Sequence, residues 1–346
     1  MTKILISLFA VFFFIFPQEE SKSMDTFNIN MDDGKHETYE INKVFVTAPA
    51  RFPDSNGLNA GVYNLKMHDL EVVIGDSCIR TLSDEEKAQE INMAYADDSI
   101  DAILCARGGH GSMNLLDYLD YDLIAENPKP IVGYSDITAL LLGINALSGI
   151  VTYHGPMVAV EMMYDGNNSI ENLINTLRGD HEIKFDYPFK TIVSGEMIGK
   201  LIVANLSLFE TIQGTKYMPS LDNCILILED TDESRESIER MIWNIQHIEE
   251  FQNLRGIIFA GFTDLENGSK NEIEELIYEH FKDSEIPVYI GLPITHGIYT
   301  KISLPLGKWA YINMEDQIIK LFDNVFEIDY WLYFIILKKH FYPEVG

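Results

Sequence analysis

The sequence predicts an α/β protein built from an N-terminal, doubly wound, mostly parallel sheet domain and a smaller C-terminal α/β domain. Three observations predict this fold. The chain of 346 residues exceeds the usual size of one domain. Its hydrophobic fraction of 47% is typical of a globular chain with a well-filled core. Short, nearly all-apolar strands alternate with helical segments, as they do in a parallel sheet that is covered on both faces.

The first domain is expected over residues 43–165. Strands are predicted at 43–50 ("KVFVTAPA"), 70–75 ("LEVVIG"), 101–109 ("DAILCARGG") and 129–134 ("KPIVGY"). Helices are predicted between them at 83–97 and 112–119, and from residue 137 onward. Ser83 is the expected N-cap of the first helix. In such sheets ligands bind beyond the carboxyl ends of the strands, where a glycine-rich loop and Ser135 fall.

The rest of the chain divides by composition. Residues 166–196 are polar and turn-rich, and predict an interdomain crossing. Residues 197–325 predict the C-terminal domain. Residues 326–346 form an apolar, aromatic tail with a basic end. A packing helix, a dimer contact and a membrane-surface segment are all compatible with this tail.

The N-terminus has a different character. Lys3 precedes thirteen nearly continuous apolar residues, then Pro17 and a polar stretch, which is typical of a secretory signal. Residues 1–23 are therefore expected to direct export to the periplasm or cell envelope, and they are the one segment expected to contact a membrane. Residues 24–42 are expected to form a polar arm. Two alternatives are an uncleaved anchor and a cytoplasmic protein whose translation starts at Met24.

Charge and composition exclude several classes of function. The formal charge of −29 argues against nucleic-acid binding, because phosphate contacts need clustered lysines and arginines. The three cysteines lack metal-ligand spacing and are expected to be buried free thiols: Cys78, Cys105 and Cys224. Neither a zinc motif nor a phosphate-binding loop is present, so no metal and no cofactor is expected.

The strongest candidate for chemistry is Ser135, which stands where an apolar strand gives way to an apolar helix. It is either a helix cap or a nucleophile held as in a nucleophile elbow. The loop "CARGGHGS" (105–112) would then offer backbone N–H groups as an oxyanion hole. Glu229, at the end of the strand "NCILILED", is a candidate acid, and His296 and His154 are rival bases.

Several longer motifs follow one another along the chain. They are "CARGGHGS", "NPKPIVGYSDITALL", "VTYHGPM", "GKLIVANLSLFETIQGTKYMP", "ILILEDTDES" and "GLPITHG". Together they resemble the LD-carboxypeptidase family of serine peptidases, which includes the muramoyltetrapeptide carboxypeptidases and the microcin C immunity peptidases. The resemblance runs from about residue 43 to residue 322, which is nearly the whole predicted folded chain.

The resemblance implies an active site between the two domains, with a Ser–Glu–His triad and neither metal nor cofactor. The nucleophile of the family's GYSD motif falls on Ser135, its acid on Glu229 and its base on His296. The backbone N–H groups of Asp136 and Gly109 are the implied oxyanion donors.

The implied activity is that of a serine carboxypeptidase that releases the terminal D-alanine from a murein tetrapeptide during peptidoglycan recycling. Arg107 is the candidate for binding the free carboxylate of the substrate, and a structural salt bridge is its alternative role. His154 is then a structural or substrate-facing residue. A homodimer is the expected assembly. Two alternatives stay open: the same triad acting on a peptide–nucleotide antibiotic of the microcin C type, and a catalytically silent peptidoglycan-binding protein.

The sequence departs from the family pattern near the expected pocket. Val203 and Ala204 replace a glycine pair, and Thr295 replaces a glycine before the base. These changes bear on substrate range more than on the chemistry. The N-terminal arm and the C-terminal tail find no counterpart in the family.

Overall fold

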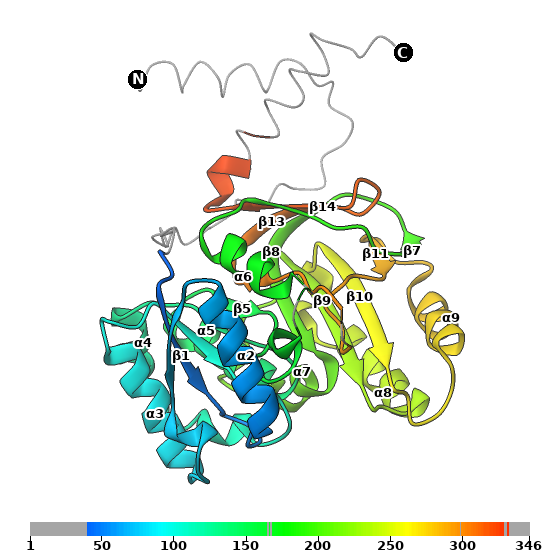
Figure 1. Ribbon diagram of the computed structural model, residues 1–346. Coiled ribbons are helices and arrows are strands. Elements are labelled where there is room, and N and C mark those ends of the chain that lie inside the picture. Colours follow the sequence, from blue (N-terminus) through cyan, green and yellow to red (C-terminus); the bar gives the residue numbers. More distant parts are fainter. Residues whose placement is uncertain (1–39, 165, 167, 298, 329–330, 332–346) are drawn as a thin grey trace, which may run out of the picture. The chain divides into compact units, whose positions relative to one another are not determined.

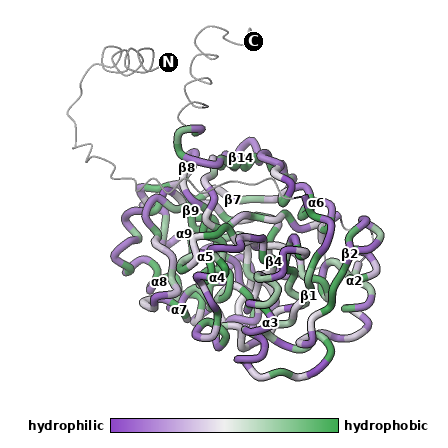
Figure 2. The backbone as a smooth tube through the Cα atoms, turned by 90° about the vertical axis from the view of Figure 1, so that its left-hand side faces the viewer, coloured by the Kyte–Doolittle hydropathy of each residue, from purple (hydrophilic) through white to green (hydrophobic). Residues whose placement is uncertain are grey.

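The computed structural model describes residues 40–164, 166, 168–297, 299–328 and 331. The signal-like segment, nearly all of the polar arm and most of the apolar tail lie outside these residues. Two sheets organise the described part, one from the N-terminal half of the chain and one mainly from the C-terminal half (Figure 1). Hydrophobic stretches are concentrated inside it, and hydrophilic stretches line much of its periphery (Figure 2).

The N-terminal sheet has six strands in the order β12-β5-β4-β3-β1-β2. Their bounds are β1 Lys43–Thr47, β2 Glu71–Ile74, β3 Ala102–Cys105, β4 Ile131–Gly133, β5 Thr152–His154 and β12 Leu304–Leu306. Strands β1 to β5 pair in parallel, and β12 runs antiparallel to β5 at one edge. Pro305 is compatible with that edge position, since proline has no backbone N–H to donate to a neighbouring strand. The predicted, mostly parallel sheet is confirmed.

Both faces of this sheet are buried, which explains why its strands are apolar throughout. In β3, Ile103 and Cys105 belong to one hydrophobic cluster, and Ala102 and Leu104 belong to another on the opposite face. Helices α3, α4 and α5 supply residues to the first cluster, and α2 and α6 to the second. Their bounds are α2 Ser55–Met67, α3 Asp84–Ala96, α4 Tyr121–Glu126, α5 Thr138–Ser148 and α6 Ser169–Leu177. Helices on both faces make the sheet doubly wound.

The C-terminal sheet is the wider of the two, with eight strands in the order β6-β14-β13-β8-β9-β10-β11-β7. Their bounds are β6 Glu182–Lys184, β7 Lys190–Val193, β8 Met197–Asn205, β9 Cys224–Thr231, β10 Gly256–Thr263, β11 Val288–Ile290, β13 Trp309–Asn313 and β14 Ile318–Phe322. The central strands β8 to β11 are parallel, and the outer strands pair antiparallel. Helices α7 Leu206–Ile212, α8 Arg235–Gln246 and α9 Lys270–Phe281 cover one face.

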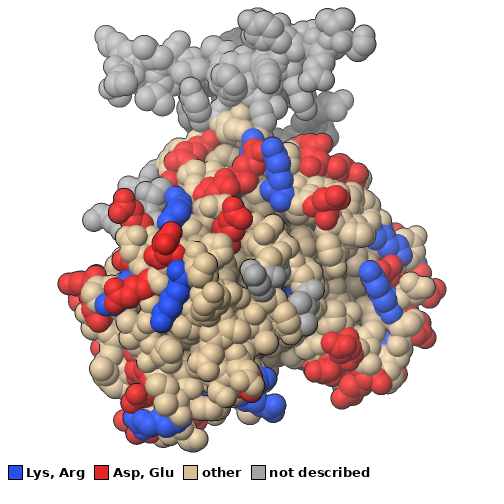
Figure 3. All heavy atoms as spheres, viewed as in Figure 1, with Lys and Arg blue, Asp and Glu red and all other residues tan. Residues whose placement is uncertain are grey.

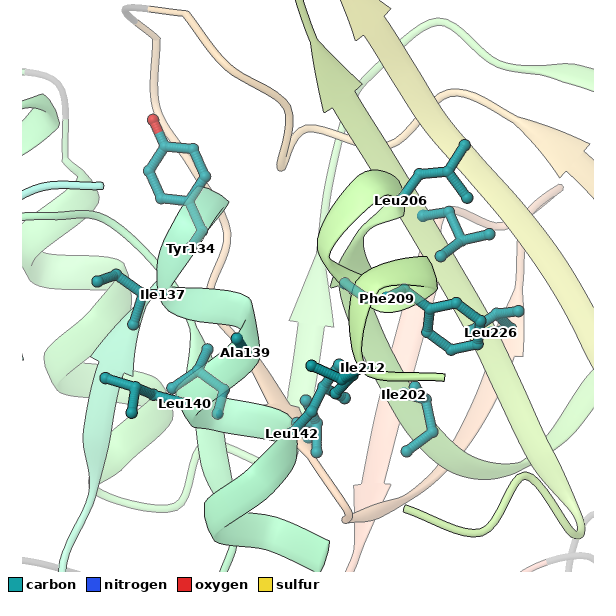
Figure 4. Packing of buried hydrophobic residues seen from close by; sticks show 14 of the residues in the cluster. Tyr134, Ile137, Ala139, Leu140, Leu142, Ile202, Leu206, Phe209, Ile212 and Leu226 are labelled. Carbon is teal, nitrogen blue, oxygen red and sulfur yellow. The ribbon is translucent and has the colours of Figure 1, made fainter. Parts of the chain in front are cut away.

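A shared hydrophobic cluster joins the two sheets. Ile137 lies just before α5, and Leu140 lies in its first turn. Both face Phe209 and Ile212 of α7 (Figure 4). All four side chains are buried. Helix α5 follows β4 and α7 follows β8, so this packing holds the carboxyl ends of those two strands near each other.

Short 3-10 helices lie in the connections: η1 Asp76–Cys78, η2 Ser112–Leu115, η3 Ser135–Ile137, η4 Glu161–Met163 and η5 Glu249–Asn253. The helix predicted at 112–119 is wrong beyond its first turn. The α-helix starts later, where the Asp120 carboxylate accepts the Leu123 N–H at 3.0 Å as an N-cap. The predicted cap at Ser83 is confirmed, and it forms a capping box with Glu86.

The observed pairing differs from the predicted domain boundaries in two places. The predicted crossing, 166–196, contains α6, which packs into the N-terminal core, and β6 and β7, which join the C-terminal sheet. The predicted C-terminal domain, 197–325, lends β12 to the N-terminal sheet. The three strands involved lie at the sheet edges: β6 and β7 at the two edges of the C-terminal sheet and β12 at one edge of the N-terminal sheet.

The start of the C-terminal tail packs on the C-terminal sheet. The ring of Trp331 lies 4.6 Å from that of Tyr311 and 5.5 Å from that of Phe322, measured between centroids. Ile328 is buried in the same cluster, and Phe326 is exposed. The rest of the tail lies outside the described residues. Over the residues that the structure describes, none of the helices has the length and apolar character needed to cross a membrane.

Candidate active site

Ser135 occupies a strained turn between β4 and α5. Its φ of 61° lies in the left-handed region, which non-glycine residues rarely adopt without a reason. Neither η3 nor α5 has a side-chain cap hydrogen bond, so the helix-cap interpretation of Ser135 is wrong. The side chain is partly exposed, although Tyr134 and Asp136 on either side of it are buried. The turn therefore presents the hydroxyl to a pocket.

Two glycines make room for this turn. A Cβ at Gly133 would lie 2.8 Å from Ile137 Cγ2, and a Cβ at Gly108 would lie 2.9 Å from the Cβ of Ser135. Both distances are shorter than a normal contact between carbon atoms, so a residue with a side chain would clash at either position. Gly108, which sequence reasoning did not single out, brings the glycine loop directly against Ser135. The doubled glycine of "RGGHG" was the signal for this close approach.

The predicted oxyanion donors lie beside the serine. The backbone N–H groups of Gly109 and Asp136 donate no hydrogen bond to other atoms in the part of the chain that the structure describes. Asp136 is fixed by Ser112, whose N–H donates to its Oδ2 at 2.9 Å and whose hydroxyl donates to its carbonyl oxygen. Gly109 has a φ of 137° and lies against the Arg51 side chain. Both residues line the same pocket as Ser135.

Glu229 and His296 are brought together from distant parts of the sequence. The Nδ1 of His296 lies 2.7 Å from Glu229 Oε2. Glu229 is fully buried in β9, whereas the His296 side chain keeps 18% exposure in the loop after β11. A β-bulge opposite Glu229 places Gly261 there, and a Cβ at that position would lie 3.0 Å from Thr295 Cγ2. The bulge thus leaves space for the loop that carries His296.

The pair favours its ionised form. Burial alone would raise the pKa of Glu229, but the attraction and hydrogen bond of His296 lower it below its usual value. Burial alone would lower the pKa of His296, but the charge and hydrogen bond of Glu229 raise it above 6.5. A carboxylate that accepts from Nδ1 leaves Nε2 as the ring atom able to take a proton from outside the pair.

Asn205 and Asp230 surround this pair and were missed in the sequence. The Asn205 amide donates to Glu229 Oε1 at 3.3 Å and to Asp230 Oδ1 at 2.7 Å. Asp230 also accepts the Ser207 N–H at 2.9 Å, which ties it to the first turn of α7. Burial and the neighbouring Glu229 raise the pKa of Asp230 to about 7. Two sequence features could have indicated them: Asp230 is the second of the paired acids in "LED", and Asn205 is the helix-capping asparagine of "NLS".

A pocket of about 440 Å³ connects these groups. Its walls include the serine turn, the glycine loop, the imidazole and two arginines: Ser135, Gly108, Gly109, His296, Arg51 and Arg107. Among the described residues no hydrogen bond joins the Ser135 hydroxyl to the His296 ring. Arg107 donates to the carbonyl of Gly108 at 3.3 Å, and no salt bridge to it is formed within the described residues. The pocket thus brings two arginines, a glycine loop and a partly exposed serine hydroxyl together.

His154 lies apart from the pocket wall. It is fully buried, and its Nε2 lies 3.2 Å from the carbonyl oxygen of Ile294. Its Nδ1 has no hydrogen-bond partner among the residues that the structure describes, and burial lowers its pKa to about 4. A neutral ring with its proton on Nε2 fits both observations. His154 therefore holds the backbone just before the His296 loop, and the structural alternative for it is the one that the geometry favours.

The remaining predicted features concern metals and charge. All three cysteines are free and buried, as predicted, and burial raises the pKa of Cys78 and Cys224 to about 12. Over the described residues, no group of three or more histidine, cysteine, aspartate or glutamate side chains is arranged to hold a metal ion. On the face shown in Figure 3, acidic side chains lie at many places, and lysines and arginines are scattered among them.

This pocket contains a strained serine, a glycine loop beside it and an imidazole bound to a carboxylate. Such an arrangement is typical of a serine hydrolase of α/β architecture. Two family models match this chain. The LD-carboxypeptidase N-terminal domain matches residues 44–155, and the LD-carboxypeptidase C-terminal domain matches residues 198–312. These matches together cover more than half of the chain, which therefore belongs to the LD-carboxypeptidase family.

Individual relatives agree with this assignment. The murein tetrapeptide carboxypeptidase of Pseudomonas aeruginosa is 28% identical over 289 residues, which cover 78% of this chain and 92% of the relative. The microcin C7 self-immunity protein MccF of Escherichia coli is 30% identical over 312 residues, with 80% and 90% coverage. A structure of MccF in complex with glutamyl sulfamoyl guanosine has a TM-score of 0.74 at 26% identity, and covers 81% of this chain and 95% of that one.

Proposed function

We propose that this protein is a serine carboxypeptidase that releases the terminal D-alanine from murein tetrapeptides through an acyl-enzyme. The observation that carries the proposal is the buried Glu229 bound to His296 in the pocket that Ser135 enters from a left-handed turn. The similarity to a murein tetrapeptide carboxypeptidase supports the substrate class.

In the proposed reaction His296 removes the proton of Ser135, and the Ser135 oxygen attacks the carbonyl carbon of the scissile L,D-peptide bond. Glu229 stabilises the imidazolium that forms. Substrate binding is expected to bring the serine and imidazole within hydrogen-bond reach, since catalytic contacts are often looser before substrate binds. The imidazolium then donates its proton to the leaving amino group of D-alanine, and water hydrolyses the acyl-enzyme by the reverse sequence.

The remaining roles follow from the walls of the pocket. The N–H groups of Gly109 and Asp136 are the proposed donors to the tetrahedral oxyanion. Arg107 is the proposed partner of the free C-terminal carboxylate, because it lines the pocket without a carboxylate partner among the described residues. The expected homodimer stays a prediction.

Mass spectrometry of a disaccharide tetrapeptide incubated with the full chain tests the proposal, with Ser135→Ala beside the wild type. The wild type is expected to remove one alanine, and Ser135→Ala is expected to leave the peptide intact. A labelled fluorophosphonate supplies a second readout, because it reports an activated serine whatever the natural substrate is. Labelling of Ser135 without loss of alanine would refute the murein assignment but keep the nucleophile.

The microcin-type alternative is favoured by the 30% identity to MccF. Cleavage of an aminoacyl sulfamoyl nucleoside in the same assay would establish it. A peptidoglycan-binding protein without activity would show neither alanine release nor fluorophosphonate labelling, and Ser135→Ala would bind murein as well as the wild type does.

A further inference from the structure

A buried lysine lies directly behind the loop that carries His296. Lys301 is fully buried, and its ammonium lies 3.4 Å from Glu161, which is fully buried as well. The ammonium also donates to the carbonyl of Thr295, and to that of Gly297 at 3.4 Å. Thr295 and Gly297 are the two neighbours of His296 in the chain. One side chain therefore holds the backbone on both sides of the imidazole.

The carboxylate partner of this lysine leads to the nucleophile. Glu161 accepts the Tyr134 hydroxyl at 2.6 Å and the Met157 N–H at 3.1 Å. Tyr134 directly precedes Ser135, and Figure 4 shows its hydroxyl pointing away from the apolar cluster below it. The Tyr134 ring meets the His296 ring edge-on, with 4.9 Å between centroids. Lys301 Nζ lies 4.8 Å from the centre of the same tyrosine ring, within the range of a cation–π contact.

These contacts form one closed circuit between two loops from different sheets. From them we propose that Lys301 is a positioning residue: through Glu161 and Tyr134 it fixes the placement of His296 relative to Ser135. The proposal rests on the proposed function, because it assigns those two residues as base and nucleophile. Its physical basis is that a displacement of about 1 Å between reacting groups can cost about a hundredfold in rate.

The backbone of Lys301 is also held in place, by helix α6. The backbone N–H of Lys301 donates to Ser169 Oγ at 3.1 Å, and its carbonyl accepts from Asn172 at 3.3 Å, both in α6. Desolvating a lysine and a glutamate together is costly, and apolar residues of similar volume often stabilise a core equally well. A buried pair kept between two loops therefore favours a role in geometry over a role in stability alone.

A second buried lysine provides a matched control. Lys129 is also buried, and its ammonium donates to two backbone carbonyls, of Ala94 at 3.1 Å and Asp97 at 2.7 Å. Those carbonyls lie at the end of α3, which supplies no residue to the pocket. Lys129→Met thus removes the same kind of contact without touching the proposed circuit.

The experiment compares Lys301→Met with Lys129→Met by steady-state kinetics on the tetrapeptide and by the rate of fluorophosphonate labelling. Lys301→Met is expected to lower kcat and the labelling rate by about 10-fold to 100-fold, with KM changed by less than about threefold. Lys129→Met is expected to keep both rates near those of the wild type. If the two variants behave alike, the proposal is wrong.

The pH dependence of kcat/KM supplies a second measurement, which a role of Lys301 in stability alone would leave unchanged. The charged and titratable groups facing His296 come from several elements: Glu229 and Asp230 of β9, Tyr134 after β4, His154 of β5, and Lys301. Among them the charge of Lys301 opposes protonation of the ring. Lys301→Met is therefore expected to raise the pKa of His296 and to move the acid limb of kcat/KM to higher pH. An NMR titration of the ring measures the same shift without substrate.

If Lys301→Met folds poorly, the double variant Glu161→Gln/Lys301→Met separates an effect on folding from an effect on the position of His296. It removes both buried charges, so stability is expected to recover, whereas kcat is expected to stay low because the carbonyls of Thr295 and Gly297 remain unheld. Recovery of kcat to the wild-type value would overturn the proposal. Failure of the wild type to release alanine, with Ser135 still labelled, would overturn the murein substrate alone and leave the labelling comparison decisive for Lys301.

Discussion

Two histidines flank the same tyrosine ring, and their surroundings give them opposite properties. The ring centroids of His154 and His296 lie 5.5 Å and 4.9 Å from that of Tyr134. His154 belongs to β5, an inner strand of its sheet, and is sealed from solvent, and the hydrogen-bond partner of its Nε2 among the described residues is the carbonyl of Ile294. His296 belongs to a loop, is partly exposed and is bound to a buried carboxylate. The two rings lie at similar distances from Tyr134, so the hydrogen-bond partner of each ring, and not its position, accounts for their different properties.

The electrostatics of the two sites differ in the same direction. Burial lowers the pKa of His154 to about 4, because neither the nearby Glu229 nor the Ile294 carbonyl offsets the loss of water. Burial acts on His296 too, but the directly bonded Glu229 outweighs it and raises the pKa. The charge of Lys301 lowers the pKa of both rings, so it does not explain the difference between them.

The largest expected effect comes from replacing each ring by glutamine. His296→Gln is expected to lower kcat for tetrapeptide hydrolysis by about 10⁴-fold or more, because removal of one member of a serine triad abolishes most of its benefit. His154→Gln is expected to lower kcat by less than about 10-fold, because a glutamine amide can still donate to the Ile294 carbonyl. Equal losses in the two variants would show that the base has been assigned to the wrong histidine.

A smaller effect, of a different kind, is expected from Glu229→Gln. The substitution keeps the size of the side chain and removes its charge, so kcat is expected to fall by about 10²-fold to 10⁴-fold. Because the charge of Glu229 raises the pKa of His296, its removal is expected to lower that pKa and to move the acid limb of kcat/KM to lower pH. Lys301→Met is expected to shift the limb in the opposite direction. A shift of both variants to the same side would contradict the proposed electrostatics.

Much of the fold was predictable because each strand carries its own signal. Apolar runs such as "DAILCA" read as buried strands, and in the structure their alternate residues do enter two different clusters. The strands at the edges of the sheets were harder to predict from the sequence. Strand β12 is only three residues long and pairs with β5, about 150 positions earlier, and no local pattern indicates such a partner. Short edge strands depend on which edge the rest of the fold leaves open.

The site shows the same division. The turn at Ser135 was visible because a polar residue stands between an apolar strand and an apolar helix, and the glycine loop was visible because close backbone approaches demand glycine. Glu229 and His296 were candidates from their places at a strand end and in a loop, but only the motif resemblance paired them, since nothing local brings them to 2.7 Å. Lys301 and Glu161 were missed because a buried charge is recognisable only once its partner is known. Polar residues in apolar segments were the available signal, and that signal does not say what they face.

The last expected effect concerns stability, not rate, and separates the two histidines once more. In the unfolded chain His154 takes up a proton as pH falls through about 6.5, whereas in the folded protein it does so only near pH 4. Between these values the unfolded state binds more protons, so the free energy of unfolding falls as pH falls. The cost to the folded state should reach about 3 kcal/mol at pH 4.

Chemical denaturation of the wild type and of His154→Gln at several pH values between 7 and 4 measures this cost as a difference. The variant has no group to protonate at that position, so its stability is expected to decline less steeply than that of the wild type as pH falls. His296→Gln is expected to give the opposite difference curve: the folded pKa of His296 is raised, so its protonation favours the folded state as pH falls. Parallel curves for the wild type and His154→Gln would mean that the folded protein admits a proton to His154, and that its burial does not distinguish it from His296.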